Sequence, residues 1–299
     1  MQHKIAVVII NWNSYLHSRN CIRSLNESSI KDFDIILVDN ASTDVSGEKL
    51  RDEFNDIIFL KTSSNLGFTG GNNKGIQYAL DNQYDYILML NNDVFVDQNF
   101  IYHLKNYLDL HPDVGAVQPL IYRHPERSKI WNGGGFFNRM LAKSFSNRTF
   151  DSNIDPKEID WISGCAFMLR ASVFRETGLL NEKYFAYHED VDLSFRIRSA
   201  GYKLVFIPAS IIYHIGGGSS NSAEKKKEGY QNPDVHYYNT RNQIWIIRTW
   251  LEWYKKPIAI LYHALYSVSL AAYFLIRMRW NKFKAVVKGF IHGFTINYT

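Results

Sequence analysis

The stretch Tyr86-Ile87-Leu88-Met89-Leu90-Asn91-Asn92-Asp93 decides the expected fold. Its five successive apolar residues predict a strand that is buried on both faces of a sheet, as in α/β proteins. The polar residues that follow then lie at the carboxyl end of the strand, where open α/β sheets place their ligand crevice. Asp93 is therefore a candidate ligand for Mg²⁺ or Mn²⁺, because these ions commonly bridge a protein carboxylate and a substrate phosphate. A turn or a helix cap is the structural alternative for this residue.

Two other apolar runs end in asparagine and aspartate in the same way. Residues 5–10 precede Asn11-Trp12-Asn13, and residues 35–38 precede Asp39-Asn40. Helical periodicity separates these runs, and a fourth apolar run follows at residues 57–60. Strands that alternate with helices predict an α/β fold, with a Rossmann-like, mostly parallel sheet flanked by helices.

A glycine-rich segment, Asn65-Leu66-Gly67-Phe68-Thr69-Gly70-Gly71-Asn72, leads into further helical periodicity. Glycines at the start of a helix let the backbone approach a nucleotide closely. The segment matches neither a P-loop nor a GxGxxG fingerprint, which argues against an NTPase and against a dinucleotide enzyme. A flexible entry into the helix is the structural alternative.

Three acids in four residues, Glu189-Asp190-Val191-Asp192, begin another helical segment that is expected to stop at Gly201. Acids at this end suit the helix dipole, which is the structural interpretation. In the functional interpretation Asp190 is a general base that takes a proton from an attacking hydroxyl, and Glu189 orients the acceptor. His214 ends a later strand-like run beside a glycine loop, and imidazole can ligate manganese.

Together, in this order along residues 4–245, these segments resemble glycosyltransferase family 2. The segments that carry the resemblance are Asn11-Trp12-Asn13, Asp39 to Asp44, Asn65 to Asn73, Asn91-Asn92-Asp93, Trp161 to Ala166, Tyr187 to Asp192 and Tyr213-His214. The resemblance implies a GT-A fold, a dTDP- or UDP-sugar as donor, a divalent metal and inversion at the anomeric carbon. The sequence is most similar to the rhamnosyltransferase-like branch, which builds bacterial surface polysaccharides on saccharide or lipid-linked acceptors.

The resemblance also assigns roles to individual residues. Asp190 falls on the catalytic base, Asp93 on the last acid of the metal motif, and His214 on a histidine of the metal or diphosphate site. The expected donor-binding residues are Asn11, Asn13, Asp39, Asn40, Gly67, Phe68, Asn72, Asn91 and Asn92. Trp161 and Gly164 are expected to border the acceptor. The metal motif contains one acid where many members of the family carry two, which lowers the ligand charge.

The chemistry expected of these residues is a single displacement. A retaining double displacement needs a carboxylate nucleophile under the anomeric carbon, and no residue in the sequence is marked for that role. Two other functions fit the same pattern: a nucleotide-sugar-binding module with a degenerate site, and a sugar nucleotidyltransferase. Measured turnover separates all three, because only the transferase releases a nucleoside diphosphate.

The charge of the chain changes toward its C-terminus. Residues 241–299 hold nine lysines and arginines against one acid, although the whole chain has a net charge of only +5. Residues 1–240 are therefore expected to form the catalytic domain, and residues 241–299 a basic, aromatic helical extension. The apolar residues 257–276 predict a helix that lies on a membrane surface, with a homo-oligomer interface or core packing as the alternative. No nucleic-acid motif accompanies the basic residues, so nucleic acid is not an expected partner.

The expected location is the cytoplasm, with peripheral attachment to the inner face of the cell membrane. Two cysteines, Cys21 and Cys165, provide no disulfide framework. The N-terminal apolar run at residues 5–10 is too short for the hydrophobic region of a signal peptide. Both observations favour a reducing compartment.

Overall fold

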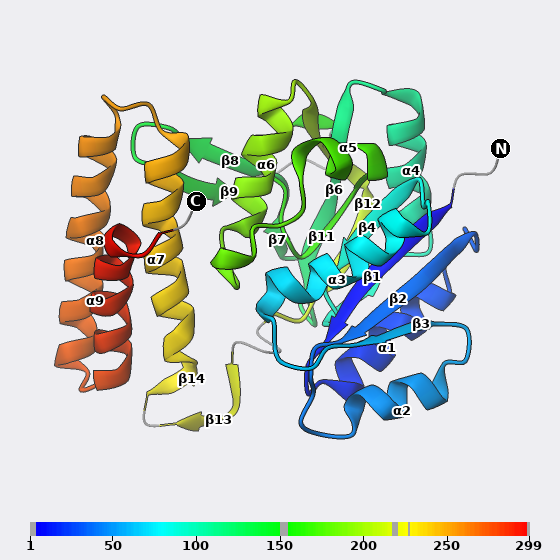
Figure 1. The fold of residues 1–299 in the computed structure, drawn as a ribbon, viewed down its shortest axis with the longest axis horizontal. Coiled ribbons are helices and arrows are strands. Elements are labelled where there is room, and N and C mark those ends of the chain that lie inside the picture. Colours follow the sequence, from blue (N-terminus) through cyan, green and yellow to red (C-terminus); the bar gives the residue numbers. More distant parts are fainter. Residues whose placement is uncertain (1–3, 150–154, 217–220, 227, 298–299) are drawn as a thin grey trace. The chain divides into compact units, whose positions relative to one another are not determined.

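The computed structural model describes residues 4–149, 155–216, 221–226 and 228–297 (Figure 1). Contacts divide the chain into two units. The first comprises Met1–Phe136, Phe145–Glu182 and Asp190–Gly216, and the second comprises Phe137–Ser144, Lys183–Glu189 and Gly217–Thr299. The domain boundary expected between residues 240 and 241 stays a prediction, and that position lies inside helix α7 (Pro233–Trp250).

A mixed, mostly parallel sheet forms the centre of the first unit. Its strands in the described residues are β1 (Ile5–Asn11), β2 (Phe33–Asp39), β3 (Ile58–Lys61), β4 (Tyr86–Leu90), β5 (Val94–Val96), β6 (Val114–Arg123), β7 (Ile130–Asn132), β10 (Lys157–Glu158), β11 (Ala166–Arg170) and β12 (Lys203–His214). The order is β10-β12-β6-β11-β4-β1-β2-β3, with β5 beside β12 and β7 beside β6. Strands β4, β1, β2 and β3 are parallel, β12 is parallel to β6, and β11 runs antiparallel to both of its neighbours.

Helices cover both faces of this sheet. They are α1 (Tyr15–Asn26), α2 (Ser46–Glu53), α3 (Gly67–Asp81), α4 (Phe100–Leu110), α5 (Ala171–Thr177) and α6 (Glu189–Ser199), with a 3₁₀ turn at Glu182–Tyr184. Side chains of β1 alternate between two apolar clusters, because successive residues of a strand point to opposite faces. Val7 packs with Ile22 of α1 and Leu104 of α4, whereas Val8 packs with Ile76 of α3 and residues of α6. Burial on both faces explains the continuous apolar runs in the sequence.

The strands expected at residues 5–10, 35–38, 57–60 and 86–90 are all confirmed. The expected stop of α6 is also confirmed, since Gly201 follows it with φ +91°. Pro208 interrupts an apolar stretch of the sequence, yet residues 203–214 form the single strand β12. The register against β6 shifts between Ile207 and Ile211, and such an irregularity accommodates a proline inside a sheet.

The glycine cluster has a packing function. Helix α3 already begins at Gly67, so the later glycines lie inside it. A Cβ atom on Gly75 would lie only 2.5 Å from Cγ1 of Val8 on β1. A side chain there would push the helix off the sheet, so close approach of α3 to the sheet requires glycine.

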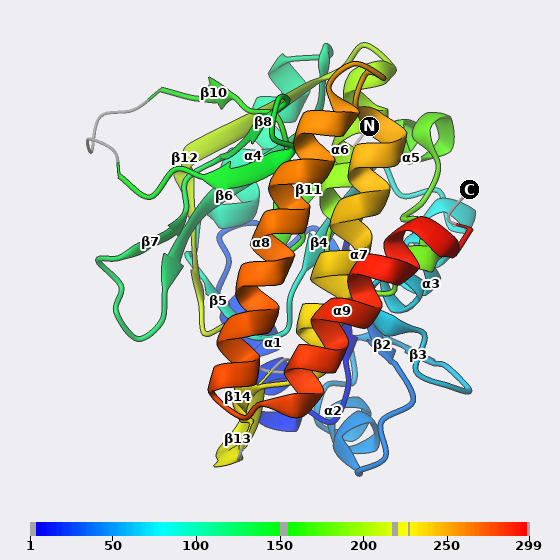
Figure 2. The same ribbon diagram turned by 90° about the vertical axis from the view of Figure 1, so that its left-hand side faces the viewer.

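The second unit is mainly helical. Its longer elements are α7, α8 (Lys256–Ile276) and α9 (Trp280–Thr295), with a small sheet of β13 (Asn221–Lys226) and β14 (Gly229–Gln231). Strands β8 (Gly135–Asn138) and β9 (Lys143–Ser146) form another two-stranded sheet. Figure 2 shows the three helices side by side, and Nη1 of Arg248 on α7 donates to the carbonyl of Gly293 on α9 at 2.8 Å. In the described part of the chain, α8 is the one helix long and apolar enough to cross a membrane.

Candidate functional site

The polar residues predicted at the strand ends meet at one edge of the sheet. Asn11 is the register partner of Asp39, because β1 and β2 are parallel. Strand β4 pairs with the other side of β1, which brings Asn91-Asn92-Asp93 to the same edge. The sheet therefore assembles the three Asn/Asp-rich corners that the sequence places far apart, as the rule for open α/β sheets requires.

A chain of hydrogen bonds connects two of these corners. Nδ2 of Asn92 donates to Oγ of Ser18 at 2.8 Å, and Ser18 donates to Oδ1 of Asn11 at 2.8 Å. Nδ2 of Asn11 lies 3.1 Å from Oδ1 of Asp39 and 2.9 Å from Oγ of Ser46. Sequence reasoning missed Ser18, since a serine within the first turns of a helix carries no distinguishing signal.

Asp39 itself has no exposed surface. Its Oδ1 accepts a hydrogen bond from Ser42 at 2.5 Å, whereas Oδ2 has no partner among the described residues. A Cβ on Gly47 would lie 2.5 Å from the carboxyl carbon, so helix α2 closes over this side chain. Asp39 thus organises the polar corner, and its contact with a nucleoside stays a prediction.

The neighbouring asparagines hold the loops around this corner. Nδ2 of Asn40 donates to the carbonyl of Gly67 at 3.0 Å, and Oδ1 of Asn40 accepts from the amide of Leu66 at 3.0 Å. Oδ1 of Asn13 accepts from the amide of Thr43 at 2.7 Å. Asn72 is buried and donates to the carbonyl of Phe68 at 2.9 Å. These bonds fix the backbone next to the expected donor-binding residues.

Asp93 and His214 lie side by side. Nε2 of His214 is 3.2 Å from Oδ1 of Asp93, and both side chains are largely buried. The sheet enforces this pairing, because His214 is the register partner of Val94, the residue after Asp93. The indole of Trp131 packs edge-on against the imidazole, with ring centroids 4.7 Å apart. Burial disfavours charge on His214, but contact with Cys165 and Asp93 outweighs this effect and raises its pKa to about 11.

A divalent cation held by this pair would take the place of the proton that the raised pKa of His214 retains, because a ligating imidazole is neutral. Two neighbouring ligands of an octahedral ion, each bonded at roughly 2.1 Å, lie about 3 Å apart. The separation between Asp93 and His214 is close to this value, and the two side chains provide one carboxylate and one imidazole. Among the described residues there is no group of three or more histidine, cysteine or acidic side chains suited to a metal. A cation held by Asp93 and His214 would take its further ligands from neutral side chains, water or a bound diphosphate.

Asp190 is more exposed than Glu189 and Asp192, the two other acids at the start of α6. Asp192 is buried and forms an ion pair with Arg196 at 3.0 Å, one helical turn later, and Glu189 is buried as well. Asp190 is only half-buried; its two carboxylate oxygens accept from the amides of Gly164 at 2.9 Å and Val191 at 2.8 Å. Burial raises the pKa of Asp190, against the opposing effect of these amides.

The same backbone segment joins Asp190 to the metal motif. The carbonyl of Cys165 accepts from the amide of Asn91 at 2.9 Å, and the preceding amide, of Gly164, donates to Asp190. Gly164 therefore contacts the expected base. Trp161 is partly buried, packs against Gly135 and donates from its indole nitrogen to the carbonyl of Phe136 at 3.0 Å. Its contact with an acceptor sugar stays a prediction.

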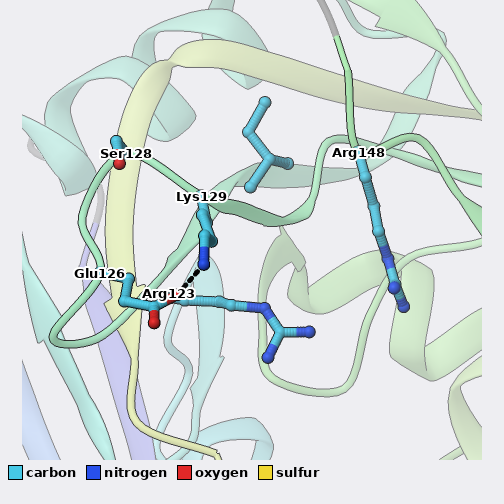
Figure 3. A pocket seen from close by; sticks show the side chains of 6 residues that line it. Arg123, Glu126, Ser128, Lys129 and Arg148 are labelled. Carbon is cyan, nitrogen blue, oxygen red and sulfur yellow. Dashed lines mark ion pairs between the residues drawn. The ribbon is translucent and has the colours of Figure 1, made fainter.

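A basic cavity of about 430 Å³ opens near the carboxyl end of β6 (Figure 3). Its lining residues are Arg123, Glu126, Ser128, Lys129, Ile130 and Arg148. Arg123 is the register partner of His214, so the cavity lies at the same end of the sheet as the Asp93–His214 pair. Lys129 is paired with Glu126 at 2.8 Å, but neither Arg123 nor Arg148 forms an ion pair within the described residues. Figure 3 shows the side chains of Arg123 and Arg148 on facing sides of this space. Sequence reasoning singled out none of these lining side chains.

Comparisons with known proteins agree on one family. The family model described as glycosyl transferase family 2 matches residues 6–178. The N-acetylglucosaminyl-diphospho-decaprenol L-rhamnosyltransferase of Mycobacterium tuberculosis is 26% identical over 238 residues, covering 72% of this chain and 76% of that protein. A low-salt glycan biosynthesis hexosyltransferase of Haloferax volcanii is 27% identical, over 66% of this chain and 62% of its own length.

Solved structures show the same fold at low sequence identity. Residues 1–349 of TarS from S. aureus, in complex with UDP-GlcNAc, superpose with a TM-score of 0.60 at 14% identity, covering 96% of this chain and 81% of that one. A mannosyltransferase from Pyrobaculum calidifontis, in complex with GDP-Man and Mn²⁺, gives a TM-score of 0.59 at 13% identity, covering 97% and 87%. The expected GT-A fold is confirmed.

Proposed function

The chain belongs to glycosyl transferase family 2, and we propose that it is an inverting enzyme that moves a sugar from a nucleoside-diphosphate donor to a lipid-linked saccharide. Its membership in the family makes it a glycosyltransferase. The finer proposal rests on the contacts of the segment Gly164-Cys165. The amide of Gly164 donates to Asp190, and the carbonyl of Cys165 accepts from the amide of Asn91 in the metal motif. The proposed base and the proposed diphosphate site would thus be joined by one short piece of backbone.

The proposed reaction uses Asp190 as its base. Its carboxylate takes the proton of an acceptor hydroxyl, and the hydroxyl oxygen forms a bond to the anomeric carbon. The bond between that carbon and the diphosphate breaks, and the nucleoside diphosphate leaves with the bonding electrons. The raised pKa of Asp190 suits a base, because a carboxylate with a higher pKa holds the transferred proton more firmly. One displacement on one face of the sugar inverts the anomeric configuration.

Asp93 and His214 are the residues proposed to hold a divalent cation. When bound there, such an ion neutralises charge that develops on the leaving diphosphate. Support comes from their 3.2 Å separation and from relatives of the same fold solved with Mn²⁺. Asn91 and Asn92 stand next to the pair and offer neutral amide groups. A nitrogen ligand favours Mn²⁺ over Mg²⁺, since Mg²⁺ prefers oxygen ligands.

The proposed donor is a dTDP- or UDP-sugar, with rhamnose as a candidate sugar. The rhamnosyltransferase relative supports the sugar, and the UDP-GlcNAc complex of TarS supports a uridine nucleotide. The proposed acceptor is a saccharide attached to lipid through a diphosphate, as the name of the rhamnosyltransferase relative states for its own acceptor. The basic cavity suits such an acceptor, because arginine binds phosphate oxygens in a bidentate manner.

Helix α8 supports a location at the membrane. Apolar side chains at intervals of three and four residues form an exposed stripe of Ile258, Leu261, Leu265 and Val268, and Leu261 and Leu265 are each 61% exposed. Ile276, Met278 and Trp280 are also exposed beyond it, among the basic residues Arg277 and Arg279. Apolar and cationic groups in this arrangement bind an anionic membrane surface. We therefore propose that the protein is cytoplasmic and binds the inner face of the membrane.

The decisive experiment is a donor screen with the purified full-length protein. Nucleoside diphosphate release is measured with dTDP-rhamnose and common UDP-sugars, with Mn²⁺ or Mg²⁺, in the presence of a lipid-linked saccharide extract. Transfer to the extract with an inverted anomeric centre, assigned by NMR of the product, supports the proposal. Donor binding without any turnover leaves a binding module, and pyrophosphate release from a nucleoside triphosphate and a sugar phosphate indicates a nucleotidyltransferase.

A further inference from the structure

The loop immediately before the expected base has an unusual backbone. Phe185, Tyr187 and His188 have φ values of 64°, 69° and 68°, in the left-handed region that residues with a side chain rarely adopt. Glu189 and Asp190 follow at once and begin helix α6. Backbone strain of this kind persists only where surrounding groups hold it, and it concentrates at functional sites.

Asn242 of helix α7 is one of the groups that hold this loop. It is fully buried, and its Nδ2 lies 3.1 Å from the carbonyl oxygen of Tyr184, 2.8 Å from that of Ala186 and 2.7 Å from that of Tyr187. A side-chain amide has two N–H groups, so at least one of these hydrogens is shared between two carbonyls. One side chain thus satisfies three backbone acceptors of a strained loop.

Arg241 completes the arrangement. Its Nη2 donates to the carbonyls of Lys183 and Tyr184, both at 2.9 Å, and its Nε donates to Oδ1 of Asn242 at 2.8 Å. The last bond orients the Asn242 amide, since it leaves the NH₂ group facing the loop.

The guanidinium of Arg241 is itself confined by aromatic rings. Its central carbon lies 4.1 Å from the ring centroid of Trp245, 4.9 Å from that of Tyr238 and 5.3 Å from that of Tyr237. Phe185 of the loop stacks on Tyr238 with centroids 5.1 Å apart. Arg241 and Asn242 are therefore held in place. Their five hydrogen bonds to the carbonyls of Lys183, Tyr184, Ala186 and Tyr187 are pre-organised.

We infer that Arg241 and Asn242 are positioning residues that hold residues 184–188 in the strained conformation from which Asp190 is presented. The inference rests on the proposed function, because it takes Asp190 to be the base. The inference gives α7 a part in the reaction. Composition alone assigns residues 241–299, which include the end of this helix, to a membrane-binding extension. Both residues act through the loop.

The test compares Asn242→Ala with Gln243→Ala in the full-length protein. Gln243 is the matched control, because it lies next to Asn242 on the same helix and donates to a different segment, at the carbonyl of Ala142. We expect Asn242→Ala to lower kcat by roughly 10- to 100-fold, since small misplacement of a reacting group has effects of this size. Donor KM should stay within about twofold in both variants, and Gln243→Ala should keep its kcat.

A second comparison separates positioning from general damage to the fold. In the Asp190→Asn background Asn242→Ala should have almost no further effect on kcat, because the residue through which it acts is already lost. Arg241→Lys should retain more activity than Arg241→Met, since lysine keeps the charge and a donor. Thermal unfolding and donor titration by calorimetry establish that each variant is folded.

Three outcomes overturn the inference: equal kcat in Asn242→Ala and Gln243→Ala, an undiminished effect of Asn242→Ala in the Asp190→Asn background, or equal losses in kcat and donor affinity. Failure of the proposed function looks different, because Asp190→Asn alone then retains its turnover. The inference fails by itself when Asp190→Asn is inactive and Asn242→Ala matches its control.

Discussion

The amide of Gly164 donates to Oδ2 of Asp190 at 2.9 Å, so the residue expected to border the acceptor fixes the residue expected to act as the base. The contact spans 26 residues of sequence. It arises because β11 begins just after Gly164, beside the carboxyl end of β4. The loop before β11 therefore helps to fix the position of the Asp190 carboxylate.

Asp190→Asn should lower kcat by roughly 100-fold or more while donor affinity stays within about twofold, because the amide keeps the shape but accepts no proton. Oδ1 of the asparagine can still accept one backbone amide. Nucleoside diphosphate release and calorimetric donor titration measure the two effects. Near-normal turnover in this variant removes Asp190 from the role of base.

The pH dependence of kcat should reflect the raised pKa of Asp190. The base works only when ionised, so activity falls as the pH drops through its pKa, and that limb should lie above about 4, the value of an ordinary aspartate. Because the pKa of Asp190 is raised in the folded state, the contribution of this group to stability is fully present below its unfolded-state pKa and is lost as the pH rises through its folded-state pKa. The unfolding temperature of Asp190→Asn minus that of the parent should therefore be larger at pH 7 than at low pH, because the asparagine stays neutral at both. A difference that does not change with pH contradicts this part of the prediction.

Asp93→Ala should weaken metal-dependent donor binding, because the diphosphate loses the carboxylate side of the proposed cation site. His214→Ala should weaken it as well. Titration of Mn²⁺ and Mg²⁺ into protein saturated with donor measures the effect, and a chelator should abolish turnover of the parent until metal is restored. If both variants show the titration of the parent, other residues hold the cation.

Arg148→Gln and Arg123→Gln should each raise the KM for a diphosphate-linked acceptor by about tenfold or more, the size expected for a lost charge-assisted hydrogen bond. The KM for the same saccharide without phosphate should not change. Arg127→Gln is the control. Arg127 stands between the lining residues Glu126 and Ser128, but its guanidinium lies over the ring of Tyr213, 4.7 Å from the centroid, instead of lining the cavity. An equal effect on both acceptors contradicts a phosphate subsite.

Leu261→Gln combined with Leu265→Gln should reduce binding to anionic vesicles by about tenfold for each leucine, as expected from the loss of buried apolar surface. The control is Leu110→Gln in α4, where a leucine is 66% exposed outside the second unit. Co-sedimentation at low and high salt measures binding, and sedimentation velocity measures self-association. If the double variant binds vesicles normally but loses a dimer of the parent, the α8 stripe is a subunit interface.

Local patterns predicted the strands and the polar corners well. Residues 86–90 form a strand with the expected bounds, because five apolar residues in a row have few alternatives in an α/β chain. The helix that begins at Glu189 and stops before Gly201 was equally clear from its acids and its glycine. In both cases residues close in sequence determine the outcome.

Contacts between distant residues could not be predicted in this way. Ser18 joins Asn92 across 74 residues, and Asn242 binds Tyr184 across 58, so neither residue carries a local signal of its partner. The glycines of α3 suggested nucleotide contact because the sequence does not reveal that Val8 lies against Gly75. Proline at residue 208 divided β12 in the sequence, although a shift in register keeps it continuous.

The bonds from Asn92 through Ser18 and Asn11 to Asp39 all run the same way: every donor in the series faces toward Asp39. Aligned dipoles polarise one another, so the links reinforce each other along the series. The series also has a fixed polarity, since reversing one amide or hydroxyl would turn two hydrogens or two lone pairs toward each other. A substitution at residue 92 should consequently change the hydrogen bonding of Asp39, on the other side of β1, without movement of the sheet.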